Sequence, residues 1–121
     1  MTVKRKIQIT SISCYKTSES GHDELYLLCQ PDAGFVKRYP SKLASSVSIK
    51  KDERWNIKDF YLEFENEVLV TLWDQDLPYD PALATYLVSY DYTKENVDAS
   101  KSVGIKNPNG AEYKIEIKII A

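Results

Sequence analysis

The sequence is poor in the residues on which many enzymes and metal sites depend. It contains one histidine, His22, and two cysteines, Cys14 and Cys29, among 121 residues. This set offers neither Cys-x-x-Cys nor His-x-x-x-His spacing, which excludes the common zinc sites. The Gly-rich phosphate loops and the Gly-x-Ser-x-Gly turn of hydrolases are also missing. Since the sequence pairs no nucleophile with a base, we expect a protein that is not an enzyme.

Long apolar runs and an excess of one charge are missing as well. No segment approaches the roughly 20 apolar residues that span a bilayer. The alternating pattern of residues 7–10 after the basic N-terminus is unlike a signal peptide. Sixteen basic against 18 acidic residues give a formal net charge of −2, which provides no global field to attract nucleic acid. We therefore expect a cytoplasmic protein that binds no nucleic acid.

What the chain has in abundance is period-two alternation of apolar residues, which is typical of strands with one buried face. Hydrophobic residues make up 43% of the chain, enough for a single core. A change of phase between Ile9 and Ile12 predicts a β-bulge near Ser11. Asn109-Gly110 is a strong hairpin signal.

These patterns predict an all-β protein, a single antiparallel β-sandwich of about eight strands over residues 3–120. Polar turns are expected at residues 31–34 and 65–67. A strand is expected over residues 85–92. The best helix candidate is a single turn over residues 80–84, and the polar residues 93–102 are predicted to form a loop.

Both cysteines lie in apolar alternating segments. We expect Cys14 and Cys29 to be buried thiols of a cytoplasmic protein. The alternative is a cross-strand disulfide, which requires an oxidising compartment.

One segment differs from the rest, because the buried strand 68–73 runs directly into Asp74, Asp76 and Asp80. Carboxylates this close repel when ionised, so they need a cation, water or backbone N–H groups nearby. Calcium takes six to eight oxygen ligands, which alternating loop aspartates can supply. The alternative is a turn in which the aspartates only shape the backbone. A second acidic loop, residues 19–26, follows the first strand and can cluster at the same end.

Three patches of the sequence resemble the C2 domain, a calcium- and phospholipid-binding β-sandwich. Gly21-His22-Asp23-Glu24-Leu25-Tyr26-Leu27 is similar to the family's Gly-x-Ser-Asp-Pro-Tyr-Val. Residues 54–64 resemble its Trp-Asn-Glu-x-Phe-x-Phe, and residues 68–84 resemble its strand, Asp-x-Asp loop and return strand. The patches keep the family's order and rough spacing over about residues 7–88. The resemblance implies a non-enzymatic binding module.

The resemblance also implies calcium as a cofactor. Asp23 matches the second aspartate of the family's first calcium loop. Asp74 and Asp76 match the Asp-x-Asp of its third loop, and Asp80 matches the last acidic ligand in shorter-loop members. The family's first aspartate falls on Thr17, where this chain departs from the pattern.

Leu77, Pro78 and Tyr79 lie between these acidic residues. In a calcium-dependent lipid binder such a tip enters the headgroup layer, which implies an anionic phospholipid membrane as partner and peripheral attachment to it. The alternative for the tip is packing on the end of the sandwich. The alternative function is a metal-independent interaction module, such as an immunity, adaptor or assembly subunit, that binds another protein.

Overall fold

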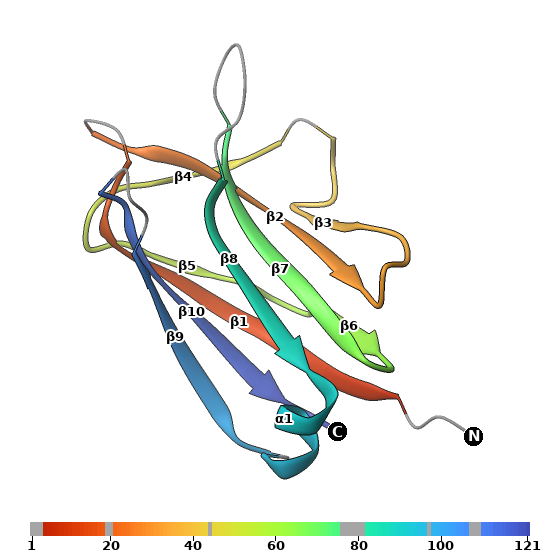
Figure 1. The fold of residues 1–121 in the computed structure, drawn as a ribbon. Coiled ribbons are helices and arrows are strands. Elements are labelled where there is room, and N and C mark those ends of the chain that lie inside the picture. The colour runs from red at the N-terminus through yellow and green to blue at the C-terminus, as the bar shows by residue number, and fades with distance from the viewer. Residues whose placement is uncertain (1–3, 19–20, 44, 76–81, 97, 107–109) are drawn as a thin grey trace.

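A computed structural model describes residues 4–18, 21–43, 45–75, 82–96, 98–106 and 110–121. Two antiparallel sheets lie face to face in it (Figure 1). The first sheet contains β1 (Arg5–Lys16), β5 (Arg54–Asn56), β6 (Tyr61–Phe64), β9 (Ser100–Lys106) and β10 (Glu112–Ile119). The second contains β2 (Asp23–Pro31), β3 (Lys37–Tyr39), β4 (Val47–Ile49), β7 (Glu67–Asp74) and β8 (Ala82–Ser89). A short helix, α1 (Tyr90–Glu95), follows β8. The predicted all-β sandwich is confirmed.

The strand order explains why the described residues form ten strands rather than eight. The first sheet runs β5-β1-β10-β9, and β6 also pairs with β1. The second runs β3-β2-β7-β8, and β4 also pairs with β2. Each short pair is therefore one interrupted edge strand, with both pieces bonded to successive parts of the same neighbour.

The apolar residues at alternate positions of the strands point inward and form the core. Val68, Val70 and Leu72 on β7 are completely buried, as are the inward residues of β1 and β10. Each such side chain contributes roughly 1.5–3 kcal/mol relative to full exposure. The register of β1 against β10 shifts between Ile9 and Ser11, which confirms the predicted bulge. The bulge keeps Ile12 inward after the change of phase.

Three local predictions are wrong. Residues 82–84 of the expected helical turn belong to β8, where Ala84 pairs with Leu72, and residues 80–81 lie outside the described part of the chain. The strand expected over residues 85–92 ends at Ser89, which caps α1 by accepting a hydrogen bond from the Tyr92 N–H at 3.3 Å. The loop expected over residues 93–102 begins inside α1 and ends inside β9.

A long-range contact explains the helix that alternation does not reveal. The Arg5 guanidinium donates to the Thr93 hydroxyl at 3.1 Å and to the Thr93 carbonyl oxygen at 2.8 Å. It also lies 5.5 Å from the centre of the Tyr90 ring. These bonds tie the last turn of α1 to β1, with a cation near the negative end of the helix dipole.

Cys14 and Cys29 are both buried, free thiols, as expected from their apolar segments. Burial raises the pKa of the Cys29 thiol to about 12, although the charge of Lys37 lowers it somewhat. Cys29 therefore stays protonated and behaves as a small apolar side chain.

The turn between β2 and β3 has an unusual backbone. Asp32 and Ala33 have φ values of 57° and 74°, and the Gly34 N–H donates to the Pro31 carbonyl oxygen at 2.8 Å. Positive φ at both central residues defines a type I′ turn, which favours Gly and Asn. Here an alanine occupies one of the two positions, so other contacts must hold the turn in place.

The Asp32 carboxylate supplies those contacts. It accepts hydrogen bonds from the backbone N–H groups of Glu65, Asn66 and Glu67 at 2.7, 2.6 and 3.1 Å. Desolvation raises the pKa of Asp32, but these N–H groups and the charge of Lys4 outweigh it, so the pKa is lower than the ordinary value. The carboxylate thus joins the β2–β3 turn to the β6–β7 turn.

We predict that Asp32→Ala lowers the free energy of unfolding at neutral pH by about 1–2 kcal/mol, because the N–H groups lose a charged acceptor. Because the pKa of Asp32 is lower in the folded state, its ionised carboxylate stabilises the fold fully above the unfolded pKa of about 4. This stabilisation is lost as the pH falls through the native pKa. The difference in the free energy of unfolding between Asp32→Ala and wild type, measured by urea titration, should therefore shrink toward acid pH. Glu63→Ala on β6 is the control, and a difference independent of pH contradicts the prediction.

Candidate functional site

Asp23 and Asp74 meet at one end of the sandwich. Asp23 is the first residue of β2 and Asp74 the last of β7, and the two strands pair so that Asp74 lies opposite Leu25. Both aspartates occupy inward-facing positions of their strands. Asp23 is 0% exposed and Asp74 is 1% exposed. The prediction that the two acidic segments cluster at one end is confirmed for these two residues.

The Ser18 hydroxyl connects the two carboxylates. Its Oγ lies 2.7 Å from Oδ1 of Asp23 and 3.2 Å from Oδ2 of Asp74. A hydroxyl has one proton, so it donates to only one of these oxygens at a time. The Ser18 N–H donates to Oδ2 of Asp23 at 2.9 Å, and the Glu24 N–H donates to Oδ1 of Asp74 at 2.8 Å. Backbone donors therefore orient both carboxylates so that one oxygen of each faces Ser18 Oγ.

Tyr113 holds Asp23 from the side of the core. Its hydroxyl, on β10, donates to Oδ2 of Asp23, and it also contacts the thiol of Cys14, its register partner on β1. Burial raises the pKa of Tyr113 far above its ordinary value, and the hydrogen bond to Asp23 raises it further. The phenol therefore keeps its proton and remains a donor to the carboxylate.

The oxygen atoms of these groups are the kind of ligand that a hard cation prefers. Two carboxylate oxygens and a hydroxyl oxygen converge on one point, and calcium prefers such oxygen ligands. Within the described ranges, no group of three or more His, Cys, Asp or Glu side chains gathers closely enough to hold a metal ion. The described residues thus place two carboxylates and one hydroxyl together at this end. Asp76 and Asp80, the other predicted ligands, lie outside the described residues, as do Leu77, Pro78 and Tyr79 of the predicted tip.

Sequence reasoning missed Ser18 and Tyr113. Ser18 directly follows Thr17, the position where the C2 pattern has an aspartate, so a hydroxyl beside a missing ligand was the available signal. Tyr113 is the one aromatic residue on the inward, otherwise aliphatic face of β10. A buried tyrosine needs a partner for its hydroxyl, which was a second signal.

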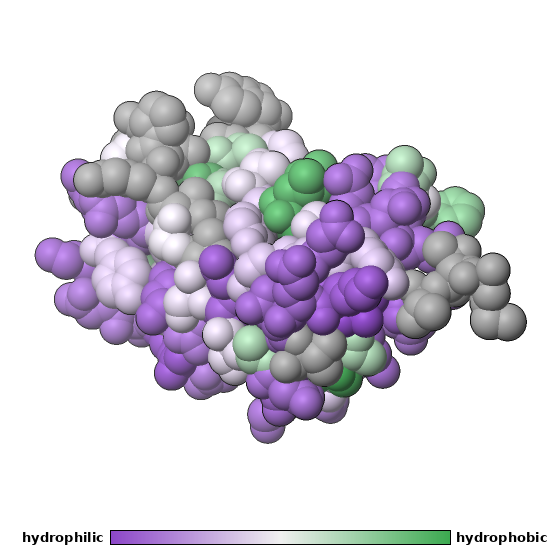
Figure 2. Space-filling view, turned by 60° about the horizontal axis from the view of Figure 1, so that its bottom comes forward, coloured by the Kyte–Doolittle hydropathy of each residue, from purple (hydrophilic) through white to green (hydrophobic). Residues whose placement is uncertain are grey.

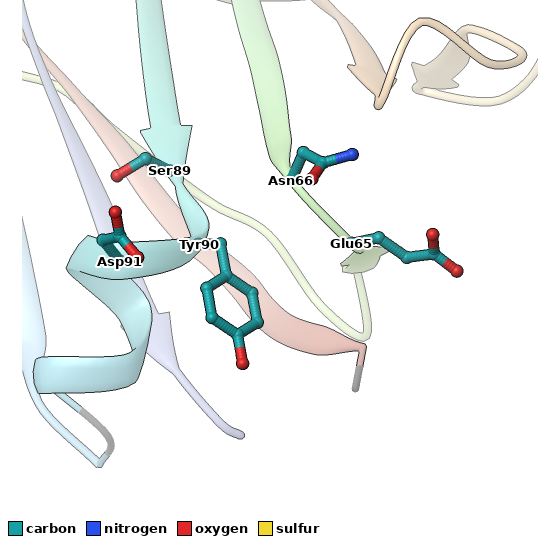
Figure 3. Close-up of a pocket in the computed structure, with 5 residues that line it drawn as sticks. All are labelled: Glu65, Asn66, Ser89, Tyr90 and Asp91. Atoms are coloured by element: carbon teal, nitrogen blue, oxygen red, sulfur yellow. The ribbon is translucent and has the colours of Figure 1, made fainter. Parts of the chain in front are cut away.

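A surface hollow of about 330 Å³ lies at the opposite end, lined by Glu65, Asn66, Ser89, Tyr90 and Asp91. Figure 3 shows the Tyr90 ring and the Glu65 carboxylate pointing in different directions, with Ser89 and Asp91 on the far side of the ring. These side chains do not converge on a common point. The arrangement therefore provides no nucleophile aligned with a base.

No model of a protein family matches the chain, and no curated protein matches its sequence. Solved structures do match it. One, described as the structure of a C2 domain, shares 10% identity at a TM-score of 0.54, with 98% of each chain covered. This chain has the fold of a C2 domain. A C2 domain of plant extended synaptotagmin 1 covers 99% of the chain at 9% identity and a TM-score of 0.56, with 96% of that domain matched.

A human GIVD cytosolic phospholipase A2, in complex with a fluorophosphonate inhibitor and terbium chloride, is similar at 10% identity and a TM-score of 0.61. The match covers 97% of this chain and 17% of that enzyme. The C2-like fold is therefore shared with a small part of a larger protein. No helix among the described residues is long and apolar enough to cross a bilayer.

We predict that Tyr113→Phe destabilises the fold by about 1–3 kcal/mol, because a buried carboxylate loses a hydroxyl donor while the ring remains. Chemical unfolding at neutral pH measures the loss. Tyr61→Phe, on the outward phase of β6, is the matched control. Equal stability of the two variants would show that the Tyr113–Asp23 bond has no net value.

Proposed function

We propose that this C2-like module is a non-enzymatic protein that binds calcium at its acidic end through Asp23, Asp74, Asp76 and Asp80. The observation that supports this proposal is the single hydroxyl of Ser18 between two buried carboxylates. Backbone N–H groups fix the other oxygen of each carboxylate. The two oxygens that face Ser18 Oγ are therefore already oriented toward a shared point, which lowers the cost of ordering them around a cation.

The electrostatics favour the same proposal. Two buried carboxylates repel each other, and one shared hydroxyl proton offsets that repulsion less than a divalent charge does. A calcium ion would contact Oδ1 of Asp23 and Oδ2 of Asp74 and accept the Ser18 oxygen as a neutral ligand. Asp76 and Asp80 follow Asp74 within six residues and would complete the carboxylate set.

Calcium should raise the midpoint of thermal unfolding, because a ligand that binds only the folded state stabilises it. The rise should increase with millimolar calcium, exceed that in magnesium, and disappear in Asp23→Asn and in Asp74→Asn with Asp76→Asn. Glu63→Gln, which removes an exposed carboxylate from β6, should keep the full response. A melting curve unchanged by calcium contradicts the proposal and favours the metal-independent interaction module.

Terbium gives a second readout that does not depend on stability. Terbium replaces calcium at oxygen sites, and its luminescence is excited by nearby aromatic rings. Tyr113 contacts the proposed site through Asp23, and Trp73 directly precedes Asp74. We predict luminescence that calcium displaces, that is lost in Asp23→Asn, and that is kept in Glu63→Gln.

Membrane attachment at this end is the second part of the proposal. With calcium bound, the carboxylates would no longer repel anionic headgroups, and Leu77, Pro78 and Tyr79 would enter the headgroup layer. The module would thus reside at a membrane when calcium is present. Cosedimentation with phosphatidylserine vesicles should require calcium. The bound fraction should fall in the double variant Leu77→Ser with Tyr79→Ser.

A further inference from the structure

Each sheet has two borders, and β8 forms one border of the second sheet. Among the described strands, β8 pairs with β7 and with no other. Figure 1 shows β8 at the outer side of this sheet, with β7 next to it. The remaining borders are formed by β9 and by the interrupted edge strands β5 with β6 and β3 with β4. An edge strand presents backbone N–H and C=O groups with which another chain can pair.

The features that usually protect an edge strand are missing from β8. Proteins keep edges short, or place charged side chains, proline or bulges on them. The strands β3, β4, β5 and β6 have only three or four residues each, and β9 carries Lys101. In contrast, β8 has eight residues, Ala82–Ser89, and none of them is charged, proline or glycine. Its residues 84–89 pair with β7 in regular register, so this part of the edge is straight enough to pair again.

The hydrogen bonds to β7 show which backbone groups of β8 face the open side. The N–H of Tyr90, the residue after β8, donates to the Asn66 carbonyl oxygen at 2.7 Å. In an antiparallel pair, every second residue directs both its N–H and its C=O to the neighbouring strand. Tyr86 therefore bonds to β7 in the same register. The residues on either side of it, Thr85 and Leu87, direct their N–H and C=O groups to the open side.

A second copy of β8 fits this open side in antiparallel orientation. When Thr85 of each chain lies opposite Leu87 of the other, the outward N–H and C=O groups of both residues are used. The two Tyr86 side chains then lie opposite each other at the two-fold axis. Tyr86 is half-buried at the border of the core, and aromatic pairs across neighbouring strands are favourable. The pairing is therefore symmetric and complete in its backbone bonds.

The lack of charge on β8 favours a second copy over a strand of another protein. When two identical strands pair around a two-fold axis, a charged residue near the axis lies close to its own copy, and like charges opposite each other are destabilising. A strand of a different protein imposes no such limit, because its charges can be complementary. A strand of eight residues without any charge is what pairing with itself requires.

The character of the surface fits an association that depends on backbone hydrogen bonds. On the face shown in Figure 2, hydrophilic residues predominate and hydrophobic residues form small separate areas. Next to the edge, Leu69 and Leu87 are opposite each other on the outer face of the second sheet and are 37% and 50% exposed. Two such leucines form a small apolar contact rather than the broad centre of a permanent interface. We therefore expect a weak, reversible association.

We propose that this chain forms a symmetric dimer in which two β8 strands pair through Thr85 and Leu87 and join the second sheets of both copies into one continuous sheet. Because the strands are antiparallel, the acidic ends of the two copies point in opposite directions. Neither Asp23 nor Asp74 takes part in the pairing. The dimer is therefore independent of the calcium proposal and forms in EGTA as well as in calcium.

Sedimentation equilibrium in EGTA, over roughly 1 μM to 1 mM protein, measures the dissociation constant of the dimer. We expect the mean mass to rise from one chain toward two. Thr85→Lys with Leu87→Lys places lysines opposite one another and should raise the dissociation constant at least about tenfold. Leu69→Lys with Thr71→Lys is the matched control, because these residues are the register partners of Leu87 and Thr85 one strand away from the edge. This control should dimerise as wild type does.

A charge exchange shows whether the lysine variant fails at the edge or fails to fold. Thr85→Glu with Leu87→Glu should also be a single chain on its own. An equimolar mixture of the glutamate and lysine variants should form a heterodimer, since opposite charges then face each other across the two strands. A mixture that remains monomeric although both variants keep the far-UV circular dichroism of wild type overturns the proposal.

Amide hydrogen exchange, read residue by residue by NMR, locates the contact. The N–H groups of Thr85 and Leu87 should exchange more slowly as the protein concentration rises, whereas that of Tyr86, already bonded to β7, should change little. A chain that stays monomeric throughout the range overturns the proposal and leaves this edge to a strand of another protein. Dimerisation that survives the lysine variant, or that requires calcium and Asp23, also overturns it.

Discussion

Asp23 and Asp74 bury two carboxylates within a sandwich whose other inward side chains are almost all apolar. A carboxylate moved out of water costs several kcal/mol unless hydrogen bonds or opposite charge replace its hydration. The chain meets this demand with backbone N–H groups of Ser18 and Glu24 and with the hydroxyls of Ser18 and Tyr113. The segment after β1, the start of β2, the end of β7 and β10 are therefore joined at one polar point. That point lies where the two sheets could otherwise separate, so their alignment at this end depends on it.

The parts of the fold that follow from local pattern could be predicted from the sequence. Alternation predicted the sheets, and the change of phase predicted the bulge near Ser11. The expected clustering of the two acidic segments at one end holds for Asp23 and Asp74. The parts that depend on distant hydrogen bonds could not. Arg5 and Thr93 are 88 residues apart, and Tyr113 and Asp23 are 90 apart. No periodicity in the sequence encodes such pairs, so α1 and the Tyr113 contact emerged only from the structure.

Strand β2 connects two aspartates that lie at opposite ends of the sandwich. β2 starts with the buried Asp23 and ends at the turn that Asp32 fixes, and these two aspartates differ in what surrounds them. Asp23 faces a second carboxylate, while Asp32 is saturated by backbone donors. The strand has nine residues, which at about 3.3 Å per residue separates its ends by roughly 30 Å. The two aspartates therefore act at opposite ends of the sandwich and do not contact each other.

Identity near 10% with structures that share the fold shows that very different sequences can adopt this sandwich. Inward apolar residues at every second position and a few polar anchors suffice to define the sandwich, and many sequences meet that requirement. The C2 pattern has an aspartate where this chain has Thr17, and the adjacent Ser18 hydroxyl bridges Asp23 and Asp74. Calcium affinity depends on the number of charged ligands. In the proposed calcium site, a hydroxyl in place of a carboxylate would weaken the attraction for calcium and would also reduce the repulsion among the carboxylates when no ion is bound.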